Sequence, residues 1–105
     1  MSIKSVLNEE LANSIRMKER YEEELIKLPK GSISKRKIKG HDYYYLVYRD
    51  NGKFKSVYRG KSVSEKELEK YDQAKKLRAK YRKALSQLKK QIRYLKGALR
   101  GKEEI

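Results

Sequence analysis

The chain has 105 residues, of which 41% are charged and 37% are hydrophobic, so its core must be thin and stripe-like. It contains no cysteine, which excludes disulfides and thiolate metal sites, and it has no apolar run of membrane-spanning length. The net charge of +15 excludes acidic mimicry of DNA and favours a polyanionic partner, with nucleic acid as the first choice.

Residues 4–28 show the apolar periodicity of a helix. The a and d positions of one heptad frame hold Leu7, Leu11, Ser14, Lys18, Tyr21, Leu25 and Leu28. Ser14 and Lys18 are the weak positions of this stripe. Pro29 ends the helix, because the residue before a proline is pushed out of the α region. This segment is nearly balanced in charge, so the positive field belongs to the rest of the chain.

Residues 32–60 predict a small antiparallel β-meander. Asn51-Gly52 separates two runs of aromatic and β-branched residues and is a strong signal for a two-residue hairpin turn. We expect Gly40-His41 to turn the basic run of residues 32–39 back against the tyrosine-rich strand. A third strand is expected because an isolated hairpin is only marginally stable.

The expected hairpin register divides the side chains between two faces. One face pairs Tyr48 with Lys55, Leu46 with Val57, and Tyr44 with Arg59. The other pairs Arg49 with Phe54, Val47 with Ser56, and Tyr45 with Tyr58. We predict that the second face, which also carries Tyr43, packs on the helices because it is slightly more apolar. Tyr44 and Tyr48 would then be exposed among lysines and Arg59.

Residues 64–99 predict the longest element. Ser64 and Glu67 form a capping box, with Val63 and Leu68 at the staple positions around it. Apolar residues then recur at spacings of three and four up to Leu99, which indicates a helix of about 35 residues. We expect residues 100–105 to form a frayed tail and residues 1–105 to form a single domain.

These elements predict an α+β protein: a long antiparallel, coiled-coil-like helical hairpin that encloses the meander. The first helix is the shorter, so we expect the end of the last helix to extend beyond it. That overhang would expose Ile92, Leu95 and Leu99, and the exposed stripe predicts a possible homodimer.

Basic residues without acidic neighbours indicate the function. From Gln73 to Lys102 there are twelve Lys and Arg and no acidic residue. The glutamates of the first helix could pair with part of them; the others favour contact with phosphates. The predicted nucleic-acid-binding residues are Lys35, Arg36, Lys37, Lys55 and Arg59 on the sheet, Lys80, Arg82, Lys83, Lys89, Lys90 and Arg93 on the helix, and Tyr44 and Tyr48 as stacking residues.

Nothing in the sequence supports catalysis. His41 is the only histidine and lies at an expected turn beside Asp42. Neither a metal-ligand cluster nor a Gly-rich phosphate loop is present. We therefore expect a cytoplasmic, non-enzymatic binding protein with no cofactor and no membrane partner.

A characteristic series of short motifs lies between the two predicted helices: Leu28-Pro29-Lys30-Gly31-Ser32-Ile33, the run from Tyr43 to Arg49, Gly52-Lys53, Lys55-Ser56, Tyr58 and Gly60-Lys61. In this layout the chain resembles small uncharacterised proteins of prokaryotes and their mobile elements. Some members of that family hold cysteine ligands between the first two strands. This chain has Lys39-Gly40-His41 there, so the resemblance implies no metal site.

Residues 45–67, a short-turn hairpin followed by a capped helix, are similar to the three-stranded arm-binding domain of phage-type integrases. In that family the sheet enters the major groove of DNA. Together these features predict a nucleic-acid-binding accessory protein of a phage or mobile element. The alternatives are an anti-CRISPR-like inhibitor of a host ribonucleoprotein, whose bases compete for guide RNA or an acidic protein surface, and a structural coiled-coil dimer.

Overall fold

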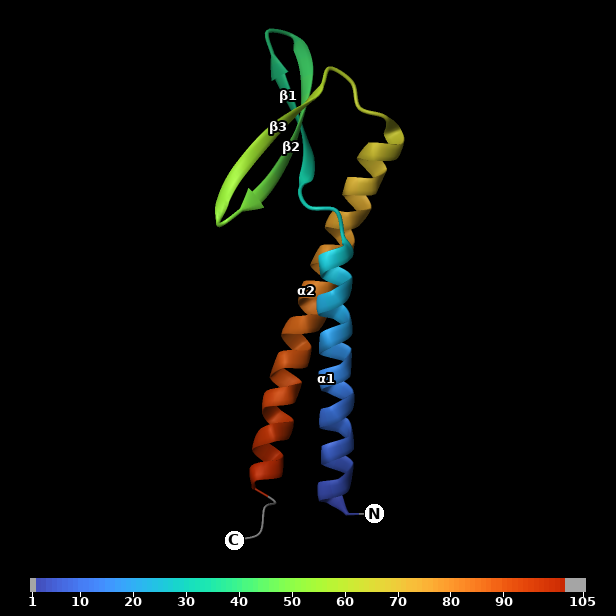
Figure 1. Ribbon diagram of the computed structural model, residues 1–105, viewed down its shortest axis with the longest axis vertical. Coiled ribbons are helices and arrows are strands. Elements are labelled where there is room, and N and C mark those ends of the chain that lie inside the picture. The colour runs from blue at the N-terminus through green and yellow to red at the C-terminus, as the bar shows by residue number, and fades with distance from the viewer. Residues whose placement is uncertain (1, 102–105) are drawn as a thin grey trace. The chain divides into compact units, whose positions relative to one another are not determined.

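The computed structural model describes residues 2–101, which form two helices and a three-stranded antiparallel sheet (Figure 1). The elements follow in the order α1 (Ile3–Lys27), β1 (Ser32–Ile38), β2 (His41–Asp50), β3 (Lys53–Gly60) and α2 (Glu65–Arg100). The predicted α+β class is confirmed, and both helices begin and end within one residue of their predicted bounds. Of the predicted tail, Arg100 is the last helical residue, and residues 102–105 lie outside the described residues.

The chain divides into two units, which we describe separately. The helical unit comprises Met1–Lys27 and Lys80–Ile105, and the sheet unit comprises Leu28–Ala79. Helix α2 contributes residues to both units.

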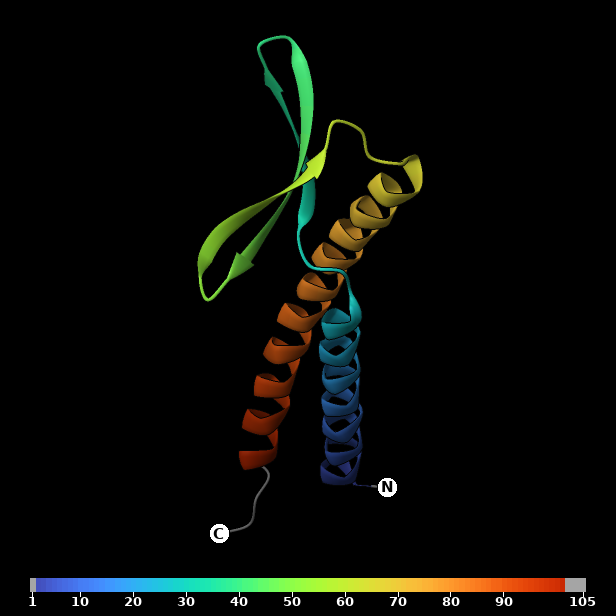
Figure 2. The same cartoon turned by 45° about the horizontal axis from the view of Figure 1, so that its top comes forward.

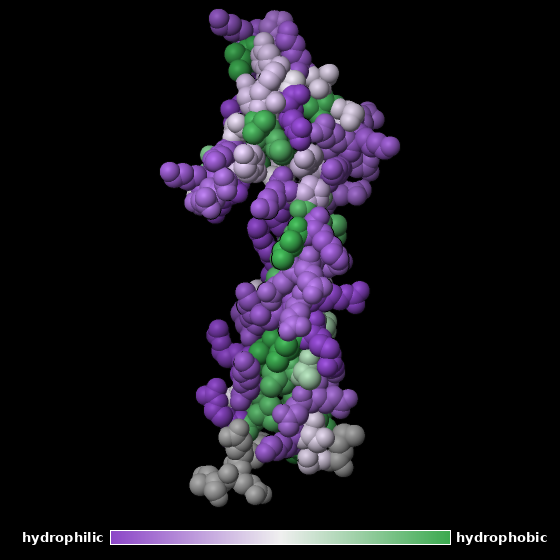
Figure 3. Space-filling view, viewed as in Figure 1, coloured by the Kyte–Doolittle hydropathy of each residue, from purple (hydrophilic) through white to green (hydrophobic). Residues whose placement is uncertain are grey.

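The helical unit is an antiparallel pair formed by α1 and the C-terminal part of α2 (Figures 1 and 2). The rings of Tyr21 and Tyr81 meet between the helices with their centroids 5.4 Å apart. Figure 3 shows the hydrophobic residues of this unit gathered between the two helices and hydrophilic residues elsewhere on the visible face. The buried α2 residues of this core are Leu85, Leu88, Ile92, Leu95 and Leu99.

Ser14 and Lys18, the two weak heptad positions of α1, differ in how deeply they are buried. Ser14 is only 3% exposed and is the most buried residue of α1, so a small side chain occupies this position of the stripe. Lys18 keeps its side chain one-third exposed and directs its Nζ to Glu22 Oε1 at 2.9 Å. A long lysine can bury its methylene stem in this way while its charge remains in water.

The apolar stripe at the end of α2 is buried, which contradicts the predicted overhang. Ile92, Leu95 and Leu99 are 9%, 6% and 9% exposed. The reason is that α1 lies beside the C-terminal part of α2, whereas the first residues of α2, up to Ala79, belong to the sheet unit. This stripe is therefore closed to a second copy of the chain, and a homodimer, if one forms, needs another surface.

The sheet has the strand order β1-β2-β3, with β2 in the centre (Figure 2). Asn51 and Gly52 both have positive φ, 50° and 79°, as a type I′ turn requires, so this predicted turn is confirmed. The first turn is one residue earlier than predicted. Lys39 and Gly40 have φ of 51° and 82°, and His41 is already the first residue of β2.

One predicted strand pair is wrong because β3 contains an irregularity. The pairs from Arg49–Phe54 to Tyr45–Tyr58 form as predicted, but Tyr44 lies opposite Gly60 rather than Arg59. Arg59 is thus the extra residue of a β-bulge, and a bulge changes the direction in which its side chain points.

Two contacts fix the start of α2 within the sheet unit. The Glu67 backbone N–H donates to Ser64 Oγ at 3.2 Å, which confirms Ser64 as the N-cap. Further along, Arg78 Nη2 donates to the carbonyl oxygen of Pro29 at 2.7 Å. That bond satisfies a carbonyl just after the end of α1 and holds the chain beside α2 where the first strand begins. Tyr71 and Ala74 are the buried residues of this part of α2.

The burial of the α2 stripe can be tested by substitution. We expect Ile92→Ala to lower the free energy of unfolding by about 2 kcal/mol or more, because it leaves a cavity between the helices. Urea unfolding followed by circular dichroism measures this change. Tyr94→Ala is the matched control, because Tyr94 lies two residues away and is 74% exposed. Equal stability of the two variants would contradict the observed packing of α1 on α2.

Candidate nucleic-acid interface

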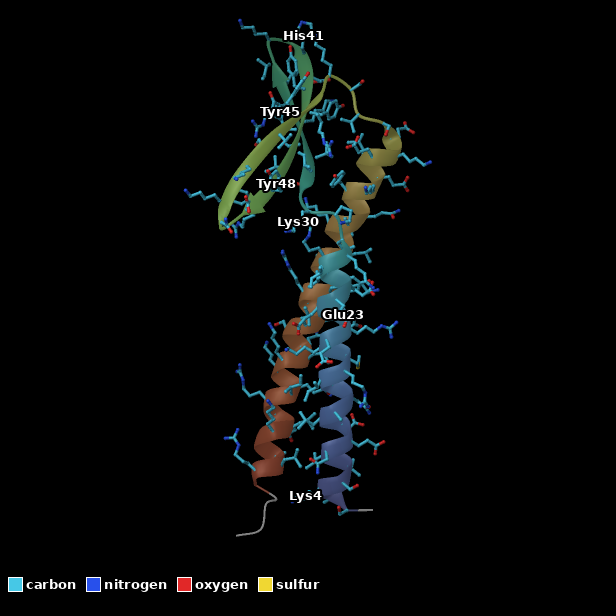
Figure 4. All side chains as sticks on the ribbon, viewed as in Figure 1. Lys4, Glu23, Lys30, His41, Tyr45 and Tyr48 are labelled. Carbon is cyan, nitrogen blue, oxygen red and sulfur yellow. The ribbon has the colours of Figure 1, made fainter. Side chains whose placement is uncertain are left out.

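Strand alternation divides the sheet into two chemically different faces. Residues opposite each other in an antiparallel pair point to the same side, and the next pair points to the other side. Tyr45 and Tyr48, labelled on β2 in Figure 4, therefore lie on opposite faces. The Lys/Tyr face carries Lys35, Lys37, Asp42, Tyr44, Tyr48, Asp50, Lys53 and Lys55, together with the apolar residues Ile33, Leu46 and Val57. The aromatic–arginine face carries Arg36, Tyr43, Tyr45, Arg49, Phe54 and Tyr58, together with Ser32, Ser34, Ile38, His41, Val47 and Ser56.

The Lys/Tyr face carries both acidic residues of the sheet, and each pairs with a lysine. Lys35 Nζ lies 3.4 Å from Asp42 Oδ2, and Lys55 Nζ lies 2.9 Å from Asp50 Oδ2. Two of the predicted phosphate-binding residues are therefore already partnered, although such exposed pairs stabilise a fold by only about 0–1 kcal/mol. Tyr44 and Tyr48 are on this face, as predicted, and both are half-buried rather than exposed.

Arg59 has partners within the protein. Its Nη2 lies 3.6 Å from Glu67 Oε1 and donates to the hydroxyl of Tyr71 at 3.3 Å. Glu67 was expected to complete the capping box with its carboxylate, and that carboxylate faces Arg59 instead. The bulge in β3 thus directs an arginine to the first turns of α2, and Arg59 ties the sheet to that helix within the sheet unit.

The aromatic–arginine face combines arginines with rings and contains no acidic residue. The Arg36 guanidinium carbon lies 4.6 Å from the centre of the Tyr45 ring, and Arg36 Nη2 donates to Ser56 Oγ at 3.2 Å. Arg49 lies over Phe54 with the same spacing of 4.6 Å. These cation–π contacts orient both guanidinium groups without neutralising them.

The rings of this face form a partly open cluster. The Tyr58 ring lies 5.5 Å from that of Tyr45 and 6.3 Å from that of Tyr43, both tilted. Phe54 is 72% exposed and Tyr58 is 52% exposed, so the prediction that this face packs on the helices is wrong for both residues. Figures 1 and 2 show the reason: the β2–β3 hairpin projects away from the first turns of α2.

The predicted basic residues of α2 form a separate surface in the helical unit. Each of them is exposed, and none makes an ion pair with a described residue; they are Lys80, Arg82, Lys83, Lys89, Lys90 and Arg93. The ion pairs of α1 stay within α1, and no pair joins it to α2 anywhere in residues 2–101. The alternative in which glutamates of α1 neutralise these bases therefore has no support in the structure.

Residues 2–101 contain neither a cluster of metal ligands nor a membrane-spanning helix. No group of three or more His, Asp or Glu side chains there could hold a metal ion. No helix in the same range is long and apolar enough to cross a membrane. His41 is an exposed strand residue opposite Ile38.

Comparisons with known proteins identify the family. A family model described as a domain of unknown function, DUF6788, matches residues 5–70, so the chain belongs to this family. The matched range includes the whole sheet but ends near the start of α2. No curated protein and no solved structure matches the chain. The predicted similarity to integrase arm-binding domains is therefore not supported by these comparisons.

The exposed rings of Phe54 and Tyr58 were not predicted from the sequence, although the spacing of the acidic residues on the tyrosine-rich strand indicated which face lacks acids. Asp42, Tyr44, Leu46, Tyr48 and Asp50 alternate along one strand, so both acids share a face with the tyrosines that we had proposed for stacking. Polyanion binding is favoured on the face that lacks acids.

The role of Arg59 can be tested by Arg59→Gln. We expect a loss of about 1 kcal/mol in the free energy of unfolding, because an exposed ion pair and a hydrogen bond to a buried tyrosine are removed. Lys37→Gln is the control of equal charge change on an exposed strand residue without an ion pair among the described residues. Thermal unfolding of both variants measures the difference, and an unchanged Arg59 variant would show that the contacts with α2 contribute nothing.

Proposed function

We propose that this member of the DUF6788 family is a non-enzymatic nucleic-acid-binding protein, the accessory protein of a phage or mobile element that the sequence led us to expect. Lysines and arginines of the sheet and of α2 contact phosphates. The proposal rests first on the exposed bases of α2 that make no ion pair within residues 2–101, together with the net charge of +15.

The arrangement of charges on α2 supports a polyanionic ligand. A surface helix ordinarily carries both signs of charge, because opposite charges three or four residues apart stabilise it. The exposed bases between Lys80 and Arg93 have no acidic neighbour on their own helix and no ion pair from α1. A nucleic acid would offset their mutual repulsion, and release of its condensed counterions would drive the association.

The sheet contributes bases of both faces to the proposed interface. Lys37 is exposed on the Lys/Tyr face, and Arg36 and Arg49 are exposed on the aromatic–arginine face. Lys35 and Lys55 would have to exchange an aspartate for a phosphate, so their contributions are expected to be smaller. Arg59 contributes least, because its partners lie within the fold.

Binding to an acidic protein surface or to a ribonucleoprotein is the competing function. No observation on the described residues favours it, and the salt dependence of binding to free nucleic acid distinguishes the two. We expect log K for nucleic acid to fall linearly with log[salt], with a slope of about −0.9 for each phosphate contacted on duplex DNA. Absence of binding to DNA and RNA at physiological salt would contradict the proposal.

The bases of α2 can be tested by the triple substitution Lys83→Gln, Lys90→Gln and Arg93→Gln. We expect a lower affinity and a salt slope that is less steep by about 0.9 for each lost contact on duplex DNA. Fluorescence anisotropy across a salt series measures both quantities.

A matched triple variant on α1 controls for net charge. Lys4→Gln, Arg16→Gln and Arg20→Gln remove the same charge from exposed positions of the same unit. This variant should keep the salt slope of the original protein. Equal losses in the two variants would mean that binding follows net charge alone and that α2 has no interface.

A further inference from the structure

We propose that the aromatic–arginine face binds single-stranded nucleic acid by stacking unpaired bases on its rings. This inference rests on the proposed function and specifies its ligand. It goes beyond phosphate contact because it assigns a second contribution to affinity, carried by residues other than the basic surface of α2.

The open rings are the first support. Phe54 is 72% exposed and Tyr58 is 52% exposed, and large aromatic side chains ordinarily bury most of their area in a fold. Both lie on β3, an edge strand of the sheet, four residues apart and on the same face. Two rings on one face of one strand offer a platform for more than one base.

The arginines are the second support. Arg49 and Arg36 each lie 4.6 Å from a ring centre, one over Phe54 and one over Tyr45. A guanidinium group held in this way is flat, charged and free of a carboxylate partner. It can stack on a base with its plane or donate to a phosphate with its edge.

The ligand is single-stranded because stacking needs a free base face. In a duplex the base faces are covered by their neighbours, and only base edges are open in the grooves. Aromatic platforms beside positive charge are the usual means of binding single strands without sequence readout. We therefore expect a preference for single strands over a duplex of equal length.

A second copy of the chain is a poorer occupant of this face. Two copies placed face to face would bring Arg36 and Arg49 of each against those of the other. No acidic residue of the face could offset that repulsion. Each copy also carries a net charge of +15, which opposes association at moderate ionic strength.

The experiment measures binding of labelled oligo(dT), oligo(rU) and a duplex of the same length to the full chain and to its variants. We expect Phe54→Ala to weaken single-strand binding by about tenfold, in line with one lost stacking contact, and Tyr58→Ala to do the same. The salt slope should not change, because no phosphate contact is removed. Phe54→Tyr should retain the affinity, since it keeps a ring.

Ile26→Ala is the control, because it removes a similarly exposed apolar side chain from α1, which carries none of the proposed binding residues, and should leave binding unchanged. The chain has nine tyrosines and no tryptophan, so quenching of tyrosine emission by unlabelled oligo(dT) gives a second readout. Tyr58→Ala should lose part of that quenching. The oligo(dT) and oligo(rU) arms report whether DNA or RNA is preferred.

Three outcomes overturn the inference, and they differ from failure of the proposed function. Equal affinity for single strand and duplex, unchanged by Phe54→Ala, would mean that phosphate contacts alone bind the ligand. A salt slope altered by Phe54→Ala would mean that this variant disturbs the basic surface. Dimers of the original protein that dissociate in Phe54→Ala, seen by analytical ultracentrifugation, would assign the face to a second copy. Absence of binding to all three ligands would instead contradict the proposed function.

Discussion

The chemistry of the two sheet faces depends on the register of three short strands, and two tight turns determine that register. Lys39-Gly40 and Asn51-Gly52 both adopt the paired positive φ angles of a two-residue turn. With those turns in place, alternation along β2 puts Asp42 and Asp50 on one face and leaves the other without acids. A slip of one residue would move the aspartates toward the arginines and cancel the charge of the open face.

The position of the acids, more than the number of bases, distinguishes the faces of the sheet. Cross-strand pairs between lysines and aspartates add little stability, since both partners stay exposed. These pairs instead determine which basic side chains are free to bind a ligand. Lys35 and Lys55 are paired with aspartates, whereas Arg36 and Arg49 lie over aromatic rings that do not neutralise their charge. Arg59 illustrates the same principle, because the bulge gives it a glutamate and a buried hydroxyl. Counting Lys and Arg in the sequence does not distinguish these paired side chains from the ones that remain free to bind a ligand.

Local signals in the sequence were sufficient for the elements but not for the packing of one element on another. Pro29, Ser64 and Asn51-Gly52 act within a few residues, so the helix ends and the second turn could be predicted. The bulge at Arg59 could not, because no turn or cap residue in the strand signals it, and the partners of Arg59 lie on α2. The predicted position of α1 along α2 was also wrong. An apolar stripe runs the whole length of α2, so the sequence pattern is compatible with α1 packing at either end. The Tyr21 ring meets the Tyr81 ring, so α1 lies beside the C-terminal part of α2, and the stripe there is buried.

The exposure of Phe54 and Tyr58 was missed for a related reason. We assigned the more apolar face to the interior, which presumes that a helix covers the whole sheet. The β2–β3 hairpin instead projects away from the first turns of α2 (Figure 1), and its rings Phe54 and Tyr58 are exposed. Because the rings on β3 and the bases on α2 belong to different elements, the two proposed contributions to affinity can be separated. We expect phosphate contacts to set the salt dependence of binding and stacking to set the preference for single strands.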